Sequence, residues 1–292
     1  MNKILFSAST WQHLRLPFSF FLLPVFSFAV ALASPVAWWR VWFALAVWHL
    51  LVYPASNGFN SYYDKDEGSI GGVERPMPVS AELLRASLLF DFLGSLLAFA
   101  LGWQFGVATI IYGVVSKAYS HPAVRLKKYP ILSLLSIGVF QGFWVFIFSV
   151  QALETATWER LFSPYILVPA CLSGLMLLGS YPMTQVYQHQ EDAKRNDLTM
   201  SRLLGIKGTF FYTAAVFAVA TAGFVYYFWQ YFGVQTALAY PVCLSPVLGF
   251  FFWWFWQVWQ NPDNANFQRT MQLNLLSAIS LNLFYVLLWW WR

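Results

Sequence analysis

Charge is scarce in this sequence: only 10% of its 292 residues are Asp, Glu, Lys or Arg, whereas a soluble domain carries about 25%. Cysteine is almost absent. Cys171 and Cys243 form no CxxC pair, and we expect both to be small core residues. No small-residue cleavage site follows the first apolar run, which argues against a removable signal peptide. The shortage of charge argues against an ordinary soluble domain.

Apolar runs fill most of the chain, which is 59% hydrophobic and 21% aromatic. A helix needs about 20 such residues to cross about 30 Å of hydrocarbon. The run from 86 to 119 exceeds one crossing, so we divide it near Gly102. The sequence therefore predicts an all-α membrane protein in which residues 1–292 form one transmembrane domain of about nine helices, over 12–33, 37–58, 83–101, 104–120, 131–150, 164–187, 208–230, 236–258 and 271–291.

The basic residues predict the orientation of these spans. Only Arg40, Arg160 and Arg292 fall on one side, which leaves 14 of the 17 basic residues on the other. The positive-inside rule places that richer side, with the N-terminus and the loops after the second, fourth, sixth and eighth spans, in the cytoplasm. We therefore expect an integral, multi-pass protein of a bacterial-type inner membrane. The net charge of +5 reflects these loops and does not indicate nucleic-acid binding.

A polar pattern occurs twice where an apolar run ends. YPASNGFNSYYD occupies residues 53–64 and YPMTQVYQHQED occupies residues 181–192, at a constant offset of 128. Tyr-Pro, a hydroxyl residue, two amides and an aspartate coincide. Because the two expected spans are four apart, they run in the same direction, and the sequence predicts a parallel internal repeat.

Each copy would place two amides and one carboxylate on one helix face, since positions 0, 3 and 7 share a face of an α-helix. Polar side chains are costly in lipid, so we expect both stripes to face the bundle interior and to form one central cavity open to the cytoplasm. Hydrogen bonding between helices is the alternative for any single amide. The two sets are Asn57, Asn60 and Asp64, and Gln185, Gln188 and Asp192.

Two facing carboxylates repel each other unless a cation lies between them. Oxygen ligands of this type suit Mg²⁺, which completes its shell with water and substrate phosphate. Basic residues on loops at the same membrane face would then bind phosphate. An apolar tunnel beside the site would accept a hydrocarbon tail, so the sequence predicts a lipid diphosphate substrate. The basic residues are Arg75, Arg125, Lys128 and Lys194.

Three motifs follow one another along the chain. NSYYDKDEG at 60–68 precedes RPMP at 75–78, YSHPAVRLKK occupies 119–128, and QHQEDAKRNDLT occupies 188–199. In this order they resemble motifs of the UbiA superfamily of intramembrane prenyltransferases. These are N-D-x-x-D-x-x-x-D with R-P-L-P, a Y-S-x-P-P-x-R-L-K loop, and D-x-x-x-D before a basic turn and a threonine. LRLP at 14–17 also resembles the start of that family's first helix.

The resemblance implies nine helices around a cavity where Mg²⁺ joins both acidic motifs to an isoprenoid diphosphate. Ionisation of the donor would give an allylic carbocation, which a lipid-soluble acceptor, commonly an aromatic ring, would capture. The cofactor is then Mg²⁺, held by Asp64, Asp192, Asn60 and Gln188. Asn57 and Gln185 would contact substrate. Arg15 and the loop cations named above would bind the diphosphate of the donor. Tyr119 would orient the diphosphate or stabilise the cation.

The sequence departs from the signatures at three positions: Ser61, Gly68 and Gln188 stand where the family has carboxylates. Nearby acids would compensate as metal ligands, namely Asp66, Glu191 and Asp197. Asp66 would reach the site only if the helix has ended, and three glycines shortly after it indicate such a break. Two other functions stay open: a secondary transporter, which also fits parallel repeats, and a family member that binds a prenyl lipid without catalysis.

Overall fold

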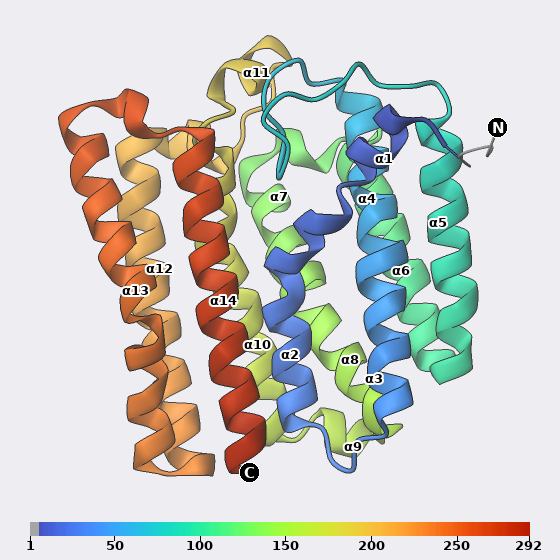
Figure 1. Ribbon diagram of the computed structural model, residues 1–292, viewed down its shortest axis with the longest axis vertical. Helices are drawn as coiled ribbons and strands as arrows, with labels where there is room; N and C mark the ends of the chain where they lie inside the picture. The colour runs from blue at the N-terminus through green and yellow to red at the C-terminus, as the bar shows by residue number, and fades with distance from the viewer. Residues whose placement is uncertain (1–5) are drawn as a thin grey trace.

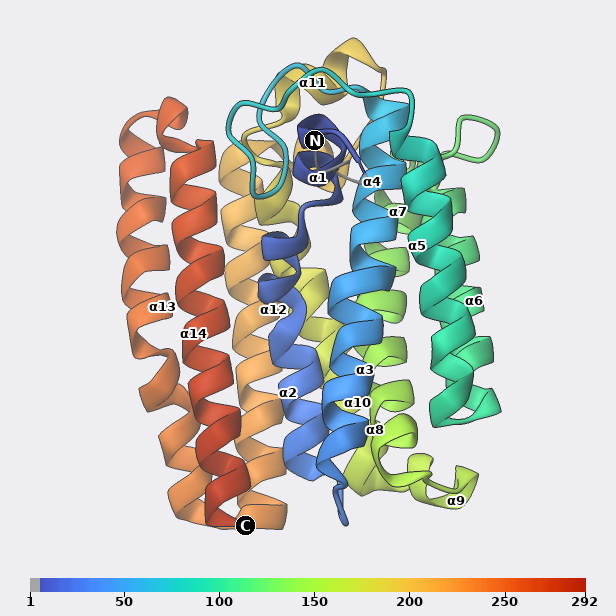
Figure 2. The same cartoon turned by 45° about the vertical axis from the view of Figure 1, so that its right-hand side comes forward.

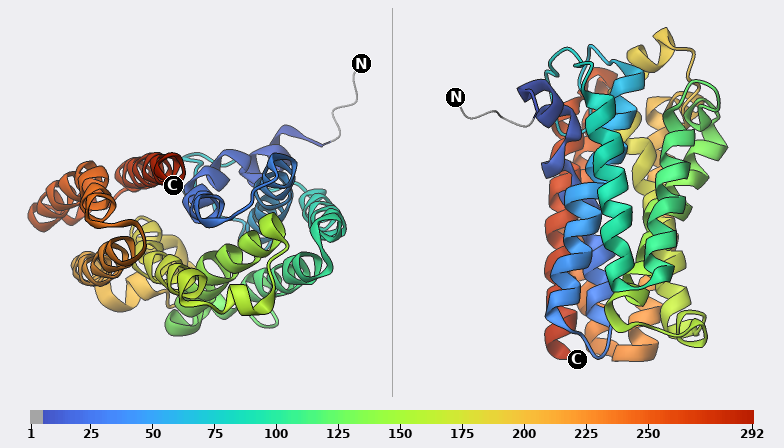
Figure 3. Two further views of the ribbon diagram at one scale, coloured as in Figure 1. Left: turned by 90° about the horizontal axis from the view of Figure 1, so that it is seen from below. Right: turned by 90° about the vertical axis from the view of Figure 1, so that its right-hand side faces the viewer.

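The fold is that of a computed structural model, which describes residues 6–292. Lys3, one of the 14 basic residues expected on the cytoplasmic side, lies outside this part of the chain. Within residues 6–292 the secondary structure is helical, apart from one isolated bridge between Ile70 and Val73. The helices run nearly parallel to one long axis (Figure 1). Seen from below, they stand side by side in an elongated bundle, with α12 and α13 at one end and α5 and α6 at the other (Figure 3).

The first half of the chain forms five long helical runs, in which 3₁₀- and π-helical segments adjoin the α-helices. The π-helical segments η2 and η5 lie inside otherwise α-helical spans, so each span continues through them. The elements are α1 (Ala8–Leu14), η1 (Leu16–Leu22), α2 (Leu23–Leu32), α3 (Trp38–Leu45), η2 (Ala46–Val52), α4 (Tyr53–Asp64), α5 (Leu83–Ala98), η3 (Phe99–Leu101), α6 (Trp103–Ser120), η4 (Leu126–Lys128), α7 (Pro130–Ile137), η5 (Gly138–Trp144) and α8 (Val145–Glu154).

The second half contains the longest helices. Gly205, at φ 70°, introduces a kink near the start of α12, a conformation that glycine adopts without a Cβ clash. The elements are α9 (Trp158–Leu161), α10 (Pro164–Ser180), η6 (Tyr181–Gln185), α11 (His189–Lys194), α12 (Met200–Phe232), α13 (Val234–Gln260), η7 (Pro262–Asn264) and α14 (Phe267–Trp291).

The all-helical membrane architecture is confirmed, but the count of nine spans is not. Seven helical stretches among the described residues are long and apolar enough to cross a bilayer: Ala8–Leu32, Leu83–Leu101, Pro130–Glu154, Pro164–Gln185, Met200–Phe232, Val234–Gln260 and Phe267–Trp291. The other two expected spans are also helical, over Trp38–Asp64 and Trp103–Ser120, and run beside the seven (Figure 1). The polar residues at the ends of α4 and α6 lower their hydropathy.

The two ends of the bundle differ in how they use cations. At the end opposite α11, Arg40 donates to the carbonyls of Leu101 and Ala152, both at 2.6 Å. At the same end, Arg292 donates to the carbonyl of Ala31 at 3.2 Å. These carbonyls lie at helix C-termini, where a positive charge is favourable. Arg40 and Arg292 therefore complete helix ends at this end of the bundle, whereas Arg15, Lys127 and Arg195 at the other end line a cavity.

Aromatic side chains fill the core between α2, α12 and α14. The Phe28 ring stacks on Tyr285 at 4.5 Å and lies 5.7 Å from Phe224. Each ring removes a large apolar area from lipid or water, and tilted or offset pairs add about 0.5–1.5 kcal/mol. This packing fixes three of the helices that line the second, apolar cavity described below.

Candidate active site

A cavity of about 240 Å³ lies among η1, α4, α6, η5 and η6 and reaches the end of the bundle that carries α11. Its lining is charged at that end and aromatic farther in, with Tyr112, Phe140 and Gln141 among the inner residues. The structure brings nine of the sequence-predicted residues into this lining: Arg15, Asn57, Asn60, Asp64, Asp66, Tyr119, Gln185, Gln188 and Asp192.

The first polar segment is helical up to its aspartate. α4 ends at Asp64, and Lys65 adopts the left-handed conformation at φ 48°, which is uncommon outside glycine. The chain therefore turns immediately after Asp64, and this turn brings Asp66 into the cavity as well. Asp66 was expected to reach the site only if the helix had ended before it, and the helix does end before it.

The second polar segment has a different conformation, and the expectation of a second stripe on one helix face is wrong. Tyr181–Gln185 is a 3₁₀-helix and Gln188 is non-helical, so α11 begins only at His189. Three residues per turn and a break in the helix abolish the spacing of an α-helical face. Gln185, Gln188 and Asp192 nevertheless line the same cavity, although they do not share one helix face.

The basic loop after α6 contributes its middle lysine. Lys127 forms an ion pair with Asp64 and lies 3.6 Å from Asp197. Lys128, which the sequence favoured, is exposed and lies over the ring of Tyr129 at 4.9 Å. In the three-residue turn η4 adjacent side chains point in different directions, so only one of the two lysines enters the cavity. The pattern of consecutive cations did not distinguish them.

Arg125 lies behind the cavity wall. It donates to both carboxylate oxygens of Asp197, at 2.9 and 2.7 Å, and its Nη1 lies 3.6 Å from Asp64. Asp197 is therefore held by two cations and lies outside the lining, so its expected role as a metal ligand has no support in the geometry. Arg75 is exposed and is also absent from the lining.

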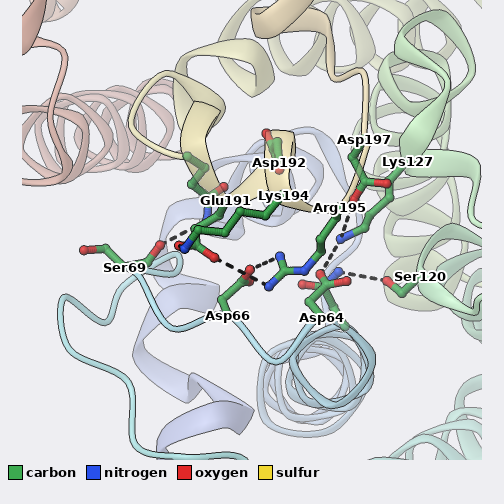
Figure 4. Close-up of polar contacts among 12 residues, drawn as sticks. Asp64, Asp66, Ser69, Ser120, Lys127, Glu191, Asp192, Lys194, Arg195 and Asp197 are labelled. Atoms are coloured by element: carbon green, nitrogen blue, oxygen red, sulfur yellow. Dashed lines mark hydrogen bonds and ion pairs between the residues drawn. The ribbon is translucent and has the colours of Figure 1, made fainter.

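At the end of α11, too, the neighbour of a predicted cation lines the cavity instead of the predicted residue. Lys194 is exposed and pairs with Glu191 at 2.7 Å, outside the cavity. Its neighbour Arg195 lines the cavity and forms an ion pair with Asp66, with Glu191 3.7 Å away. Figure 4 shows Lys127 and Arg195 reaching Asp64 and Asp66 from different sides. Neither Lys127 nor Arg195 was among the predicted site residues, although both lie in basic turns beside residues that were.

The remaining predicted residues form the walls near the carboxylates. Arg15 is 9% exposed, donates to the carbonyl of Asn57 at 3.2 Å and leaves its Nε without a partner. Asn60 donates to the hydroxyl of Ser120 at 2.9 Å, so its side-chain oxygen is the atom left for a ligand. Tyr119 shares a hydrogen bond with Tyr181, a residue that the repeat pairs with Tyr53 but that the site prediction omitted.

The oxygen donors fit a hard cation such as Mg²⁺. Burial raises the pKa of Asp192 to about 6, although a hydrogen bond from Thr199 at 3.1 Å opposes this effect. Buried Oδ1 of Asp64 accepts no hydrogen bond. Among residues 6–292 no three His, Cys, Asp or Glu side chains cluster for a metal, but Mg²⁺ needs only one or two carboxylates when phosphate and water supply the rest.

A second, mainly apolar cavity continues from the first. The two share Phe21, Leu177, Ser180 and Asn274 in their linings. The second one extends between α12, α13 and α14 to the core ring Tyr285. A charged environment and an apolar one therefore lie side by side, as a ligand with a charged head and a hydrocarbon tail would require.

Comparison with known proteins agrees with this arrangement. The sequence profile of the UbiA prenyltransferase family matches residues 21–277. The chain belongs to this family. Together with the seven apolar helices, this membership makes it an integral, multi-pass membrane protein. The UbiA signatures recognised in the sequence were thus sufficient to identify the family.

Individual relatives are more distant. The chain is 36% identical to digeranylgeranylglyceryl phosphate synthase of Methanosarcina barkeri over 96 residues, and this match spans 32% of either chain. A UbiA homologue from Archaeoglobus fulgidus, solved with DMAPP and Mg²⁺, has a TM-score of 0.68 at 15% identity and covers 96% of this chain and 99% of its own. The apo homologue from Aeropyrum pernix K1 has a TM-score of 0.71 at 19% identity, with 94% and 98% covered. At such identities these structures show the shared fold.

Proposed function

We propose that this chain is a Mg²⁺-dependent prenyltransferase that moves a prenyl group from an isoprenoid diphosphate to an aromatic, lipid-soluble acceptor. One observation carries the proposal: Asp64 and Asp192, from segments 128 residues apart, line one cavity with buried cations at its charged end and an apolar branch behind it. The Archaeoglobus fulgidus homologue, solved with DMAPP and Mg²⁺, supports the choice of donor class and metal.

Asp64, Asp192 and the side-chain oxygen of Asn60 would hold Mg²⁺. When bound, this ion supplies positive charge that stabilises the leaving diphosphate. Arg15, Lys127 and Arg195 would bind the diphosphate oxygens. Lys127 and Arg195 would exchange their carboxylate partners, Asp64 and Asp66, for phosphate oxygens. Phosphate forms equally strong charge-assisted hydrogen bonds. The allylic carbon–oxygen bond then breaks with its electron pair on the diphosphate.

The inner part of the cavity suits the carbocation and the acceptor. Tyr112, Tyr119, Phe140 and Tyr181 line it, and ring faces attract positive charge. Gln141 offers an amide in the same lining. An aromatic acceptor with a hydroxyl or carbonyl group would stack on the rings and attack the carbon from the side opposite the diphosphate. Its ring proton would leave with solvent or with the diphosphate. The prenyl tail would occupy the apolar branch.

We also propose that the charged end of the bundle faces the cytoplasm of a bacterial-type inner membrane, with the N-terminus on that side. The 14-to-3 division of basic residues supports this orientation. Cys171 and Cys243 are first replaced by Ser, since both are free thiols. Labelling of single cysteines then introduced at Arg75 and at Glu159, with a reagent that cannot cross the membrane, tests the orientation. Selective labelling of the Glu159 variant in intact cells supports the orientation, and the reverse pattern contradicts it.

The transporter alternative is less favoured because the charged lining lies at the end of the bundle that carries α11. A non-catalytic lipid-binding member would keep the cavity but release no pyrophosphate. Purified protein incubated with a prenyl diphosphate, Mg²⁺ and candidate aromatic acceptors should release pyrophosphate and form a prenylated product.

Asp64→Ala and Asp192→Ala should abolish this turnover, while Asp263→Ala, the same change at an exposed residue of η7, should not affect it. Full turnover by either cavity variant would overturn the metal assignment. Uptake into proteoliposomes without pyrophosphate release would support transport instead.

A further inference from the structure

Two departures from the family signatures lie against each other in the structure. Gln188, at a position where the family has a carboxylate, donates from Nε2 to the backbone carbonyl of Ser69 at 3.1 Å. Ser69 directly follows Gly68, the position of the missing third carboxylate in the first signature. Figure 4 shows Ser69 beside Glu191 at the edge of the cluster of charged residues. The two motifs are thus joined by a hydrogen bond that their consensus sequences would not form.

The chemistry of this contact depends on the amide. A carbonyl oxygen accepts hydrogen bonds, and an ionised carboxylate also only accepts. Aspartate or glutamate at position 188 would therefore place two acceptors against each other and lose the bond. The amide that replaces the family's carboxylate gives up a charged metal ligand and supplies a donor in its place.

The lack of a side chain at Gly68, in the first motif, also allows the close contact between the two motifs. A Cβ added at Gly68 would lie 3.2 Å from Cγ of Glu191 and 3.5 Å from its Oε1. A side chain at position 68 would therefore be in tight contact with Glu191, which pairs with Lys194 at 2.7 Å. The loss of the side chain at position 68 lets the second motif pack directly on the backbone of the first.

The hydrogen bond lies on a loop that covers the charged end of the cavity. The first-motif loop, residues 65–82, joins α4 to α5 and passes over that end of the bundle (Figure 2). Its residues Ile70 and Gly71 line the cavity. Arg195 holds the loop through Asp66, and Gln268 of α14 holds it through Glu74. Gln188 anchors the loop between these two points.

We propose that Gln188 is a positioning residue that holds the first-motif loop closed over the diphosphate, and that it is not a metal ligand. This proposal rests on the proposed prenyl transfer. A closed loop keeps water from the allylic carbon while the carbon–oxygen bond is broken. If water enters, its oxygen bonds to that carbon and releases a proton, and the products are a prenyl alcohol and pyrophosphate. Gln188 thus favours transfer to the acceptor over hydrolysis.

Gln188→Glu tests the proposal because it keeps the shape of the side chain and removes the donor. We expect the share of donor converted to prenyl alcohol to rise severalfold. Amide hydrogen exchange in residues 66–76 of the metal-free protein should become faster. Mn²⁺ affinity, measured by electron paramagnetic resonance, should not increase. If Gln188 is a metal ligand instead, the added carboxylate would tighten Mn²⁺ binding and leave loop exchange unchanged, and this result would overturn the proposal.

Two controls make the outcome specific. Gln190→Glu makes the same chemical change at an exposed position outside the cavity lining, so loop exchange and alcohol share should match the original protein. Gln188→Ala removes the donor without adding charge, so it should also speed loop exchange. Unchanged loop exchange in a folded Gln188→Ala protein would overturn the proposal, even if Gln188→Glu did not fold. Loop exchange requires no turnover, so a failure of the proposed function itself would appear separately, as absence of pyrophosphate release from the original protein.

The double variant Gly68→Asp with Gln188→Asp gives the strongest contrast, since it restores two carboxylates of the family signatures. If those carboxylates were simply missing ligands, the variant would bind Mn²⁺ more tightly and turn over faster. We expect a lower ratio of prenylated product to alcohol, because the side chain at position 68 meets Glu191 and the hydrogen bond to Ser69 is lost. A higher ratio than in the original protein would contradict the proposal.

Discussion

Asp197 accepts two hydrogen bonds from Arg125, from Nε at 2.9 Å and from Nη2 at 2.7 Å. Its carboxylate is 1% exposed and also lies 3.6 Å from Nζ of Lys127. A buried carboxylate with two such partners fixes the loop that carries both cations, and this loop forms one wall of the cavity. The pair therefore links the segment after α11 to the segment after α6.

We expect Asp197→Ala to destabilise the protein by about 3–5 kcal/mol, because removal of one partner leaves a buried charge uncompensated. Unfolding in detergent, followed by circular dichroism, measures this loss. The double variant Arg125→Ala with Asp197→Ala should lose less than the sum of the two single variants. A stable Asp197→Ala protein that no longer binds Mn²⁺ would instead make Asp197 a metal ligand.

Lys127→Met should weaken binding of the diphosphate donor. Loss of one hydrogen bond to a charged group costs about 1.5–3 kcal/mol, or roughly 10- to 150-fold in affinity. Titration calorimetry with pyrophosphate and Mg²⁺ provides the measurement. Lys128→Met is the matched control, since Lys128 is exposed outside the lining. Equal losses in the two variants would show that the loop acts only through its total charge.

The stability of the metal-free protein should depend on pH through Asp192. Its pKa is about 6 in the folded protein and about 3.9 in an unfolded chain. The folded state thus binds this proton more tightly, so the contribution to stability is fully present below about pH 4 and is lost as the pH rises through about 6.

Asp192→Asn cannot titrate at this position. The stability of the original protein relative to Asp192→Asn should therefore fall by roughly 3 kcal/mol between about pH 4 and pH 7, since each unit of pKa shift corresponds to about 1.4 kcal/mol. Thermal unfolding of both metal-free proteins across this range gives the difference. A difference that stays constant with pH would show that burial does not shift this carboxyl.

Gly142→Ala should destabilise the contact between η5 and α10. The added Cβ would lie 2.5 Å from Cα of Gly174, in the backbone of the neighbouring helix. Overpacking of this kind costs about 1–3 kcal/mol. Gly249→Ala is the matched control, because a Cβ there meets no atom within 4 Å. An unfolding temperature for Gly142→Ala equal to that of the control would mean that the two helices can move apart freely.

Much of the site could be predicted from the sequence, and the failures have specific causes. Asp64 and Asp192 were identified because polar residues are rare in such apolar runs, and both line the cavity. Lys128 and Lys194 were chosen over their neighbours Lys127 and Arg195, since a pattern of adjacent cations does not specify which side chain turns inward. The second stripe was expected on an α-helix, but local propensity gave no sign of the 3₁₀ turn at Tyr181–Gln185.

The sequence by itself determined that the chain crosses a membrane as apolar helices, that two polar segments end at one face, and that the family is UbiA. Hydrocarbon penalises every unpaired polar group, so length and composition are sufficient to predict the helical spans. The two polar segments and the family follow from the repeated pattern and from the three motifs in their order. Only the tertiary structure decided which cations pair with Asp64 and Asp66, and that Gln188 donates to the carbonyl of Ser69. Those contacts join loops far apart in the chain, and their geometry depends on how the helices beneath them pack.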